Sequence, residues 1–277
     1  MKKETKIPNP ALPVAYHLEA PVVRGAAFAP FLGGSALKGP EEWSQGLLRD
    51  DLGTDHVSTR NPHLSELSVL YAAWKNHPEW THYGIAHYRR FMLARPTWVQ
   101  RWLVQPEFRL WTDLDALKPA FTLGPEDLWG QQLLVSTTRT YRVPLRADYL
   151  RWHDSRDLAV LQEAMERHHP GMSKPWNRFL DTGHDLTPFN MMFGARAEVD
   201  RYCEWLFPML LDADRELGAK PDGYAARHAS FLAERLFSFY LQHERISLRR
   251  VPVVQLGSHT ADRYPLLHGT YDRLKRR

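Results

Sequence analysis

The chain has 277 residues, of which 43% are hydrophobic and 25% charged, a composition typical of a soluble globular protein and not of a disordered one. Its 36 basic and 32 acidic residues give a formal net charge of +4, with no basic stripe of the kind that binds nucleic acid. The one short basic run, residues 273–277, is typical of a solvated terminus, or of weak contact with the phosphates of a membrane surface.

Cysteine content and hydropathy indicate a compartment. The lone Cys203 excludes an intrachain disulfide, which fits a reducing environment. The N-terminal residues lack the apolar segment of a signal peptide, and no run approaches the roughly 20 apolar residues of a membrane span. We therefore expect a cytoplasmic protein, with at most peripheral contact at the inner face of a membrane.

The N-terminal part alternates loop and strand signals. Residues 1–12 are polar and contain proline, so we expect a loose segment there, as at 268–277. An apolar run predicts a first strand from Val14 to Leu18. Residues 21–53 are rich in glycine and proline, which indicates loops, and they lack the Gly-Lys-Ser/Thr sequence of a P-loop.

A helix is predicted from Asn61, with Asn61 as its N-cap and Pro62 in its first turn, up to His77-Pro78. Apolar residues recur along it at helical spacing: Leu64, Leu67, Leu70, Tyr71 and Trp74. A buried strand from Tyr83 to His87 follows after a short connection. Helix and strand should therefore be packed neighbours.

The remaining elements also alternate. In chain order, the patterns predict a strand at 133–135, helices at 145–152 and 158–168, a loop at 170–188, a strand at 189–193, helices at 197–217 and 224–243, and a strand at 248–254. No internal repeat or linker interrupts them. We expect a single α/β domain over residues 1–277.

The segment YGIAHYRRF, residues 83–91, carries the strongest chemical signal. An apolar strand runs directly into His87, Tyr88, Arg89 and Arg90. Arginine stays charged at any working pH, and its planar fork of donors matches the geometry of a phosphate. The segment therefore predicts a phosphate site, with a cluster of ion pairs at a strand end as the alternative.

Several other chemistries lack support. The 14 histidines show no HExxH spacing, one cysteine excludes a Cys-based zinc site, and there is neither a Gly-x-Ser-x-Gly elbow nor a Gly-x-Gly-x-x-Gly turn. Asp-x-Asp strings, which can hold a divalent cation against a diphosphate, occur at 113–115 and 212–214. The first lies in a weakly patterned region and the second inside a helix, where we expect a solvated face. Dependence on Mn²⁺ or Mg²⁺ stays open, since arginines can also neutralise a diphosphate.

Four segments in order carry a family resemblance: NPHLSELSVLYAAWKN at 61–76, YGIAHYRRF at 83–91, FNMMFGARAEVDRYCEWLFPML at 189–210 and FLAERLFSFYL at 231–241. Together they resemble the DUF4422 family of bacterial capsular and exopolysaccharide biosynthesis proteins, regarded as glycosyltransferases. The likeness extends over roughly residues 14–255. The chain departs from the family's usual residues at Ser68 and Ala233.

The resemblance implies a GT-A-like (Rossmann-like) α/β fold with a mixed central sheet. It also implies transfer of a hexose, such as galactose, from a UDP-linked nucleotide sugar to a glycan or lipid-linked glycan in capsule, exopolysaccharide or O-antigen synthesis. A non-catalytic protein that binds nucleotides or carbohydrates is the alternative.

Roles for individual residues follow as hypotheses from the resemblance. Donor binding is assigned to His17, Asp51, Ser58, Asn61, His87, Arg89 and Arg90. Contacts with the acceptor or the sugar are assigned to Glu66, Tyr88 and Asn190, although Glu66 and Asn190 could instead be structural. The catalytic carboxylate of an inverting transfer would be Glu234 or Asp185. For Glu234, a solvated position or an ion pair with Arg227 is the competing interpretation.

Overall fold

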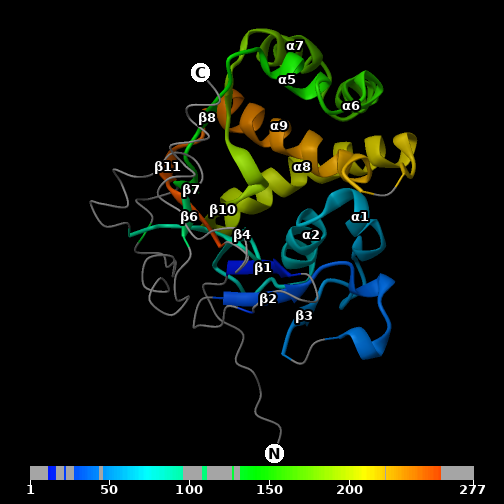
Figure 1. Ribbon diagram of the computed structural model, residues 1–277, viewed down its shortest axis with the longest axis vertical. Helices are drawn as coiled ribbons and strands as arrows, with labels where there is room; N and C mark the ends of the chain where they lie inside the picture. Colours follow the sequence, from blue (N-terminus) through cyan, green and yellow to red (C-terminus); the bar gives the residue numbers. More distant parts are fainter. Residues whose placement is uncertain are drawn as a thin grey trace, which may run out of the picture.

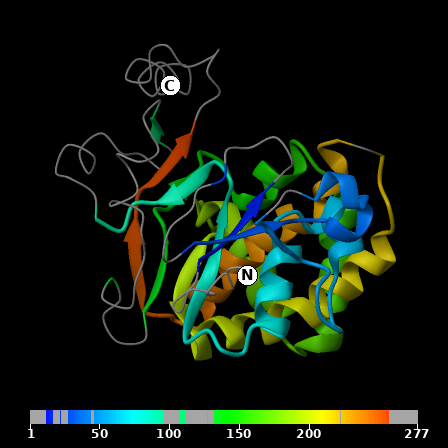
Figure 2. The ribbon, with the colours of Figure 1, turned by 90° about the horizontal axis from the view of Figure 1, so that it is seen from below.

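A computed structural model describes residues 12–16, 22, 28–43, 46–95, 108–110, 127, 132–221 and 223–256. Ten strands of this described part form one mixed sheet, and two more form a small separate sheet. The longer helices gather mostly on one side of the large sheet (Figure 2). The predicted α/β class with a mixed central sheet is confirmed.

The strands of the large sheet are short. They are β1 (Leu12–Tyr16), β2 (Phe28–Leu32), β3 (Leu48–Arg49), β4 (His82–His87), β5 (Arg90–Met92), β6 (Phe108–Leu110), β7 (Leu133–Ser136), β10 (Met192–Ala195), β11 (Leu248–Val251) and β12 (Val253–Leu256). The small sheet pairs β8 (Arg139–Thr140) with β9 (Asp185–Leu186).

The strand order β11-β7-β10-β4-β1-β2-β3 places one antiparallel strand in an otherwise parallel array. Strand β10 runs antiparallel to both of its neighbours, β4 and β7, whereas β1 pairs in parallel with β2 and β4. As a result, the carboxyl ends of β1, β2, β4 and β7 meet at one edge of the sheet. Ligands of open α/β sheets bind at this edge.

Seven α-helices occur in the described part of the chain: α1 (Asn61–Leu64), α2 (Leu67–Asn76), α5 (Leu145–Leu150), α6 (Ser155–His168), α7 (Ser173–Thr182), α8 (Arg196–Leu217) and α9 (His228–His243). Figure 1 shows α8 and α9 between the group α5–α7 and the half of the molecule that contains β1–β3, α1 and α2. Contacts join α2 to β1 and β4, and α8 to β10, α6 and α9.

Helix α8 confirms the helix predicted at residues 197–217, and one of its faces is apolar and buried. Its core side chains Val199, Tyr202, Cys203, Leu206 and Leu210 are fully buried. Val199, Leu206 and Leu210 each contribute about 1.5–3 kcal/mol relative to full exposure, by the usual value for burying a large aliphatic side chain. Since α8 contacts both strand β10 of the sheet and helix α6, these buried side chains connect the sheet to α6.

The helix predicted from Asn61 is divided into two. Asn61 is the first helical residue and not the N-cap, which is Arg60. Ser65 has φ 51, which ends α1, and α2 begins at Leu67. The side-chain amide of Asn61 donates to the Ser65 carbonyl (2.8 Å) and to Ser68 Oγ (2.8 Å), so it stabilises the break. The sequence pattern does not reveal this break, because the apolar spacing continues across Ser65.

Several other elements differ from the sequence prediction. Strands β2 and β3 lie within residues 21–53, where loops were expected. The expected loop at 170–188 contains helix α7, whose Trp176 and Leu180 are fully buried. The strand expected at 189–193 starts only at Met192, since Phe189 and Asn190 have φ 77 and 52. The last predicted strand is divided at Pro252, which separates β11 from β12.

Gly84 of the YGIAHYRRF segment lies where two strands approach closely. A Cβ atom there would lie 1.8 Å from the carbonyl oxygen of Met192 on β10. Any larger residue would push β10 away from β4. No helix of the described residues is long and apolar enough to cross a membrane.

Candidate active site

A pocket of about 1020 Å³ opens at the carboxyl edge of the parallel strands. Its walls include Ala15 and Tyr16 from β1, the segment 87–90 after β4, and Arg139 after β7. The opposite wall comes from helix α9 and from the segments around residues 148–153 and 223–227. The pocket therefore lies where the topology predicts a ligand.

One wall of the pocket is cationic. Arg89, Arg90 and Arg139 all line it. The guanidinium carbon of Arg90 lies 4.5 Å from the ring centroid of Phe189, and that of Arg139 lies 5.8 Å from the same centroid. Stacking on an aromatic face holds a guanidinium in a fixed orientation. Three permanent positive charges thus face one cavity, as a diphosphate requires.

Phe189 is held in a strained backbone conformation by two groups of the pocket. Its φ of 77 is unusual for a residue other than glycine. Its N–H donates to Glu234 Oε1 (2.6 Å), and its carbonyl accepts from His87 Nε2 (2.7 Å). The ring that orients Arg90 and Arg139 is therefore fixed by a carboxylate on α9 and an imidazole at the end of β4.

His87 is a neutral positioning residue in this arrangement. Burial lowers its pKa, with Arg90 adding to the effect and Glu66 opposing it. Because a carbonyl oxygen only accepts, Nε2 of the neutral ring carries the proton that bonds Phe189. The imidazole lines the pocket without contributing charge to it.

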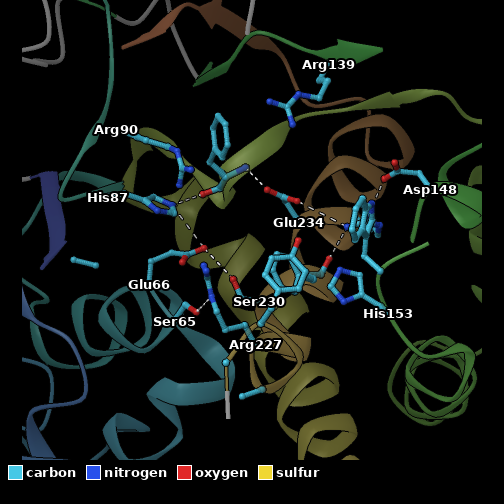
Figure 3. A pocket seen from close by; sticks show the side chains of 18 of the residues that line it. Ser65, Glu66, His87, Arg90, Arg139, Asp148, His153, Arg227, Ser230 and Glu234 are labelled. Atoms are coloured by element: carbon cyan, nitrogen blue, oxygen red, sulfur yellow. Dashed lines mark hydrogen bonds and ion pairs between the residues drawn. The ribbon is translucent and has the colours of Figure 1, made fainter. Parts of the chain in front are cut away.

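Glu234 lies in the middle of the pocket. In Figure 3 it stands between the group formed by His87 and Arg90 and the group formed by His153 and Asp148. Its side chain is 18% exposed. Burial raises the pKa of its carboxyl group, although Arg235 and the Phe189 N–H partly oppose the shift. A carboxylate of raised pKa that reaches the cavity is suited to accept a proton.

Glu66 is a second carboxylate of the pocket and is only 5% exposed. Its Oε1 accepts from Asn190 Nδ2 (2.8 Å) and from Ser230 Oγ (3.3 Å). Asn190 does not line the pocket itself; it also donates to the Ser230 carbonyl (3.3 Å), so it orients Glu66 from behind.

The structure brings together seven of the sequence-predicted residues. Those that line the pocket are Asn61, Glu66, His87, Tyr88, Arg89, Arg90 and Glu234. Arg227 does not form the ion pair with Glu234 that was the competing interpretation. Its Nε donates instead to Ser65 Oγ (3.0 Å). His17 lies outside the described residues.

Besides Asn190, three predicted residues of the described part lie away from the pocket lining. Asp185 is exposed on β9 and accepts from Thr140 Oγ1 (2.6 Å). Asp51 pairs with Arg49 (2.6 Å), and Ser58 is fully buried against Asp50. Their assigned roles in donor binding or catalysis stay predictions.

Asp50, which the sequence does not single out, organises the loop after β2. It is fully buried and accepts from the backbone of Gly34 and Ser35 and from the hydroxyl groups of Ser58 and Ser68. These bonds tie the loop to α2. They fix the edge of the pocket at Gly33 and Asn61 without reaching into it.

Arg139 and His153 are pocket residues that the sequence analysis missed. A signal for Arg139 existed, because it follows the end of a predicted buried strand by a few residues, as Arg89 and Arg90 do. No comparable signal marks His153. It reaches the pocket only because α5 and α6 pack beside α9.

His63, Asp214 and His228 form the group of potential metal ligands found among the described residues. Both imidazoles approach the same oxygen, Oδ1 of Asp214, at 2.7 Å for His63 Nδ1 and 3.1 Å for His228 Nε2. Arg60 donates to the other oxygen at 2.6 Å. These are hydrogen-bond distances. The group is therefore interpreted as a hydrogen-bond network that joins α1, α8 and α9. The expectation of a solvated face at 212–214 is wrong for Asp214, whose side chain is 1% exposed.

Replacing Asp214 by Asn is expected to lower the free energy of unfolding by about 3 kcal/mol, as when one partner of a buried ion pair is lost. Burial alone would raise the pKa of Asp214, but His228, His63 and Arg60 together hold it below its usual range. The stabilisation is therefore present above the pKa of the unfolded chain and is lost as the pH falls through the lower folded pKa.

Urea unfolding from neutral pH to about pH 3 measures this difference. Asp212→Asn on the same helix is the control, since Asp212 pairs with Arg167 at the surface and should contribute at most about 1 kcal/mol. A loss for Asp214→Asn that is no larger than the control's, or that persists unchanged in acid, would contradict the expectation.

The pocket carboxylates among the described residues are engaged with protein groups. Besides Glu66 and Glu234, Asp148 lines the pocket and accepts from Arg235 Nη2 (3.0 Å). They do not form a group of three convergent metal ligands within the described part of the chain. Asp113 and Asp115, the other candidates for Mn²⁺ or Mg²⁺, lie outside the described residues.

Fold and pocket together define an α/β protein with a cationic ligand site at the carboxyl edge of a mixed sheet. Residues 12–245 match the family described as a domain of unknown function, DUF4422, and the chain belongs to this family. No curated protein matches the sequence.

Among solved structures, the chain is similar to the apo structure of WbbM, a bifunctional glycosyltransferase. The TM-score is 0.74 and the identity 22%, over 90% of this chain and 46% of that one. The chain thus spans less than half the length of WbbM. At this identity the likeness shows the fold alone, and the expectation of a fold shared with a glycosyltransferase is confirmed.

Proposed function

We propose that this protein is a glycosyltransferase that moves a hexose from a nucleoside-diphosphate sugar to a glycan acceptor. The observation that carries the proposal is one pocket in which three arginines face a carboxylate of raised pKa. Cleavage of a nucleotide sugar leaves negative charge on the departing diphosphate, and fixed positive charges stabilise that charge best. Membership of the family and a fold shared with WbbM support the same class.

The donor is proposed to lie across the ends of the parallel strands. Its nucleoside, a uridine in the UDP-hexose that we favour, would contact the wall formed by Ala15, Tyr16 and Asn61. Its diphosphate would bind Arg89 and Arg90. We assign Arg139 to the same diphosphate, because it shares the Phe189 ring with Arg90.

Glu234 is proposed as the general base of an inverting transfer. Its carboxylate would take the proton of the acceptor hydroxyl as that oxygen bonds to the anomeric carbon, while the bond to the diphosphate breaks. The acceptor is a glycan or lipid-linked glycan of bacterial surface polysaccharide synthesis. A divalent cation, if one is used, would add positive charge beside the arginines.

Release of nucleoside diphosphate from a set of nucleotide sugars, with and without Mn²⁺, tests the proposal. Slow hydrolysis of one donor in the absence of acceptor, faster with a glycan present, is expected of a transferase. Binding of a nucleotide sugar with no turnover under any of these conditions would indicate the alternative, a non-catalytic binding protein. Failure to bind any nucleotide sugar would contradict the proposal and leave, of the alternative, only a carbohydrate-binding protein.

A further inference from the structure

The wall of the pocket opposite Arg89, Arg90 and Arg139 is rich in aromatic rings, and Arg227 lies over one of them, with its guanidinium carbon 5.4 Å from the Phe231 ring centroid. His153 stacks on Tyr224 with 5.4 Å between ring centroids and 14° between planes. Phe231 lies 4.4 Å from the His153 ring and 4.5 Å from the Tyr224 ring. We call these three residues the aromatic platform; all of them line the pocket.

Exposure distinguishes this wall from ordinary core packing. Tyr224 is 55% exposed, and Trp152, which lines the pocket beside the aromatic platform, is 70% exposed. A group of exposed aromatic side chains at a cavity wall is typical of a ligand-binding groove. Burial lowers the pKa of His153 to about 4, so its ring is neutral at physiological pH.

We propose that the aromatic platform, with Trp152 beside it, binds a hexopyranose ring of the acceptor glycan. This inference rests on the proposed function and names the acceptor side of the same pocket. The C–H groups on one face of a pyranose are weakly positive and lie well on the negative face of an aromatic ring. Its hydroxyl groups project sideways, where polar side chains can meet them.

Asp148 supplies such a polar group. It lines the pocket, and one of its oxygens, Oδ2, accepts from Arg235 (3.0 Å). A carboxylate has two oxygens, so the other can accept from a sugar hydroxyl. The contact with Arg235 fixes the orientation of that oxygen, and Figure 3 shows Asp148 and His153 on the same side of Glu234.

The position of Glu234 assigns this wall to the acceptor and not to the base of the donor. Figure 3 places Glu234 between His153 on one side and His87 and Arg90 on the other. A general base must lie within hydrogen-bond reach of the acceptor hydroxyl, while the oxygen of that hydroxyl stays free to contact the anomeric carbon of the donor. If the diphosphate binds Arg89 and Arg90, an acceptor sugar on the aromatic platform presents its hydroxyl to Glu234, and the nucleoside is left to the ends of β1 and β2.

Saturation-transfer NMR with methyl hexopyranosides, together with calorimetric titration of UDP, tests the inference on the full chain. Saturation of the aromatic protons is expected to reach the C–H groups of at least one glycoside. Tyr224→Ala and Trp152→Ala should each weaken glycoside binding by about tenfold, a typical loss on truncating an aromatic side chain that a ligand covers, and leave the affinity for UDP unchanged. Tyr224→Phe should keep the binding of glycosides.

Leu37→Ala is the matched control, since Leu37 is 54% exposed and does not line the pocket. Weaker UDP binding in Tyr224→Ala with unchanged glycoside binding would overturn the inference and assign the aromatic platform to the nucleobase. Glycoside binding that is absent in the wild type, or equal in all variants, would also overturn it. The proposed function is judged separately, by whether the wild type binds and cleaves a nucleotide sugar.

Discussion

Glu234→Gln is expected to lower kcat for sugar transfer by about 10²–10⁴-fold, the usual contribution of a general base. The variant should bind UDP as the wild type does, because the amide keeps an oxygen that can accept from the N–H of Phe189. A loss confined to kcat would separate proton transfer from donor binding. The measurement is steady-state transfer with the donor that the hydrolysis screen identifies.

The rate of transfer is expected to depend on pH in a defined direction. Burial raises the pKa of Glu234, so the acid limb of the wild-type rate should lie above the ordinary glutamate value of 4.5. Activity should rise as the pH increases through the raised pKa, and Glu234→Gln should lack this limb.

The contribution of Glu234 to the free energy of unfolding should change with pH in the opposite direction to the activity. A carboxyl group whose folded pKa is raised favours the folded state in acid, and this contribution is lost as the pH rises through the folded pKa. Glu234→Gln should therefore be no less stable than the wild type at neutral pH. Asp185→Asn is the companion variant, since Asp185 is the other predicted base; full activity in Glu234→Gln with loss in Asp185→Asn would exchange the two roles.

Arg89→Ala and Arg90→Ala are each expected to weaken UDP binding by about 10- to 100-fold, since a hydrogen bond to a charged group contributes about 1.5–3 kcal/mol. Uridine, which has no phosphates, should bind the variants and the wild type equally. The affinity of the wild type for UDP should also fall with added salt, whereas that for uridine should not. Isothermal titration calorimetry measures all of these.

Arg167→Ala is the control for these variants. Arg167 is a surface arginine paired with Asp212 and Glu216 and is not part of the pocket lining. Thermal unfolding should show that Arg89→Ala and Arg90→Ala stay folded. Normal UDP affinity in both arginine variants would remove the diphosphate from this wall, and with it the main support for the proposed function.

The segment 83–91 was predicted in part from the sequence alone. Local order and composition there predict a buried strand that ends in His87, Arg89 and Arg90, and the structure places these residues on the pocket wall. What the sequence does not reveal is that His87 is neutral and bonds the Phe189 carbonyl. That contact joins residues 102 positions apart, and only the pairing of β4 with β10 creates it.

Amphipathic spacing likewise predicted helix α8. It did not predict that Asp214 on this helix is buried. Periodicity indicates which face of a helix is polar, yet it does not show whether that face meets water or other helices, here α1 with His63 and α9 with His228. The break at Ser65 also escaped the pattern, because apolar spacing continues through it and the bonds of Asn61 that stabilise it depend on side-chain geometry.

The sequence by itself thus determined the class of fold, most helices and the cationic segment, since these depend on local spacing and residue type. Only the tertiary structure decided the composition of the pocket. Arg139, Glu234 and His153 come from three separate segments, and the sheet order and the packing of α9 bring them to one cavity. Long-range strand pairing and helix packing decide such meetings, and no local pattern encodes them.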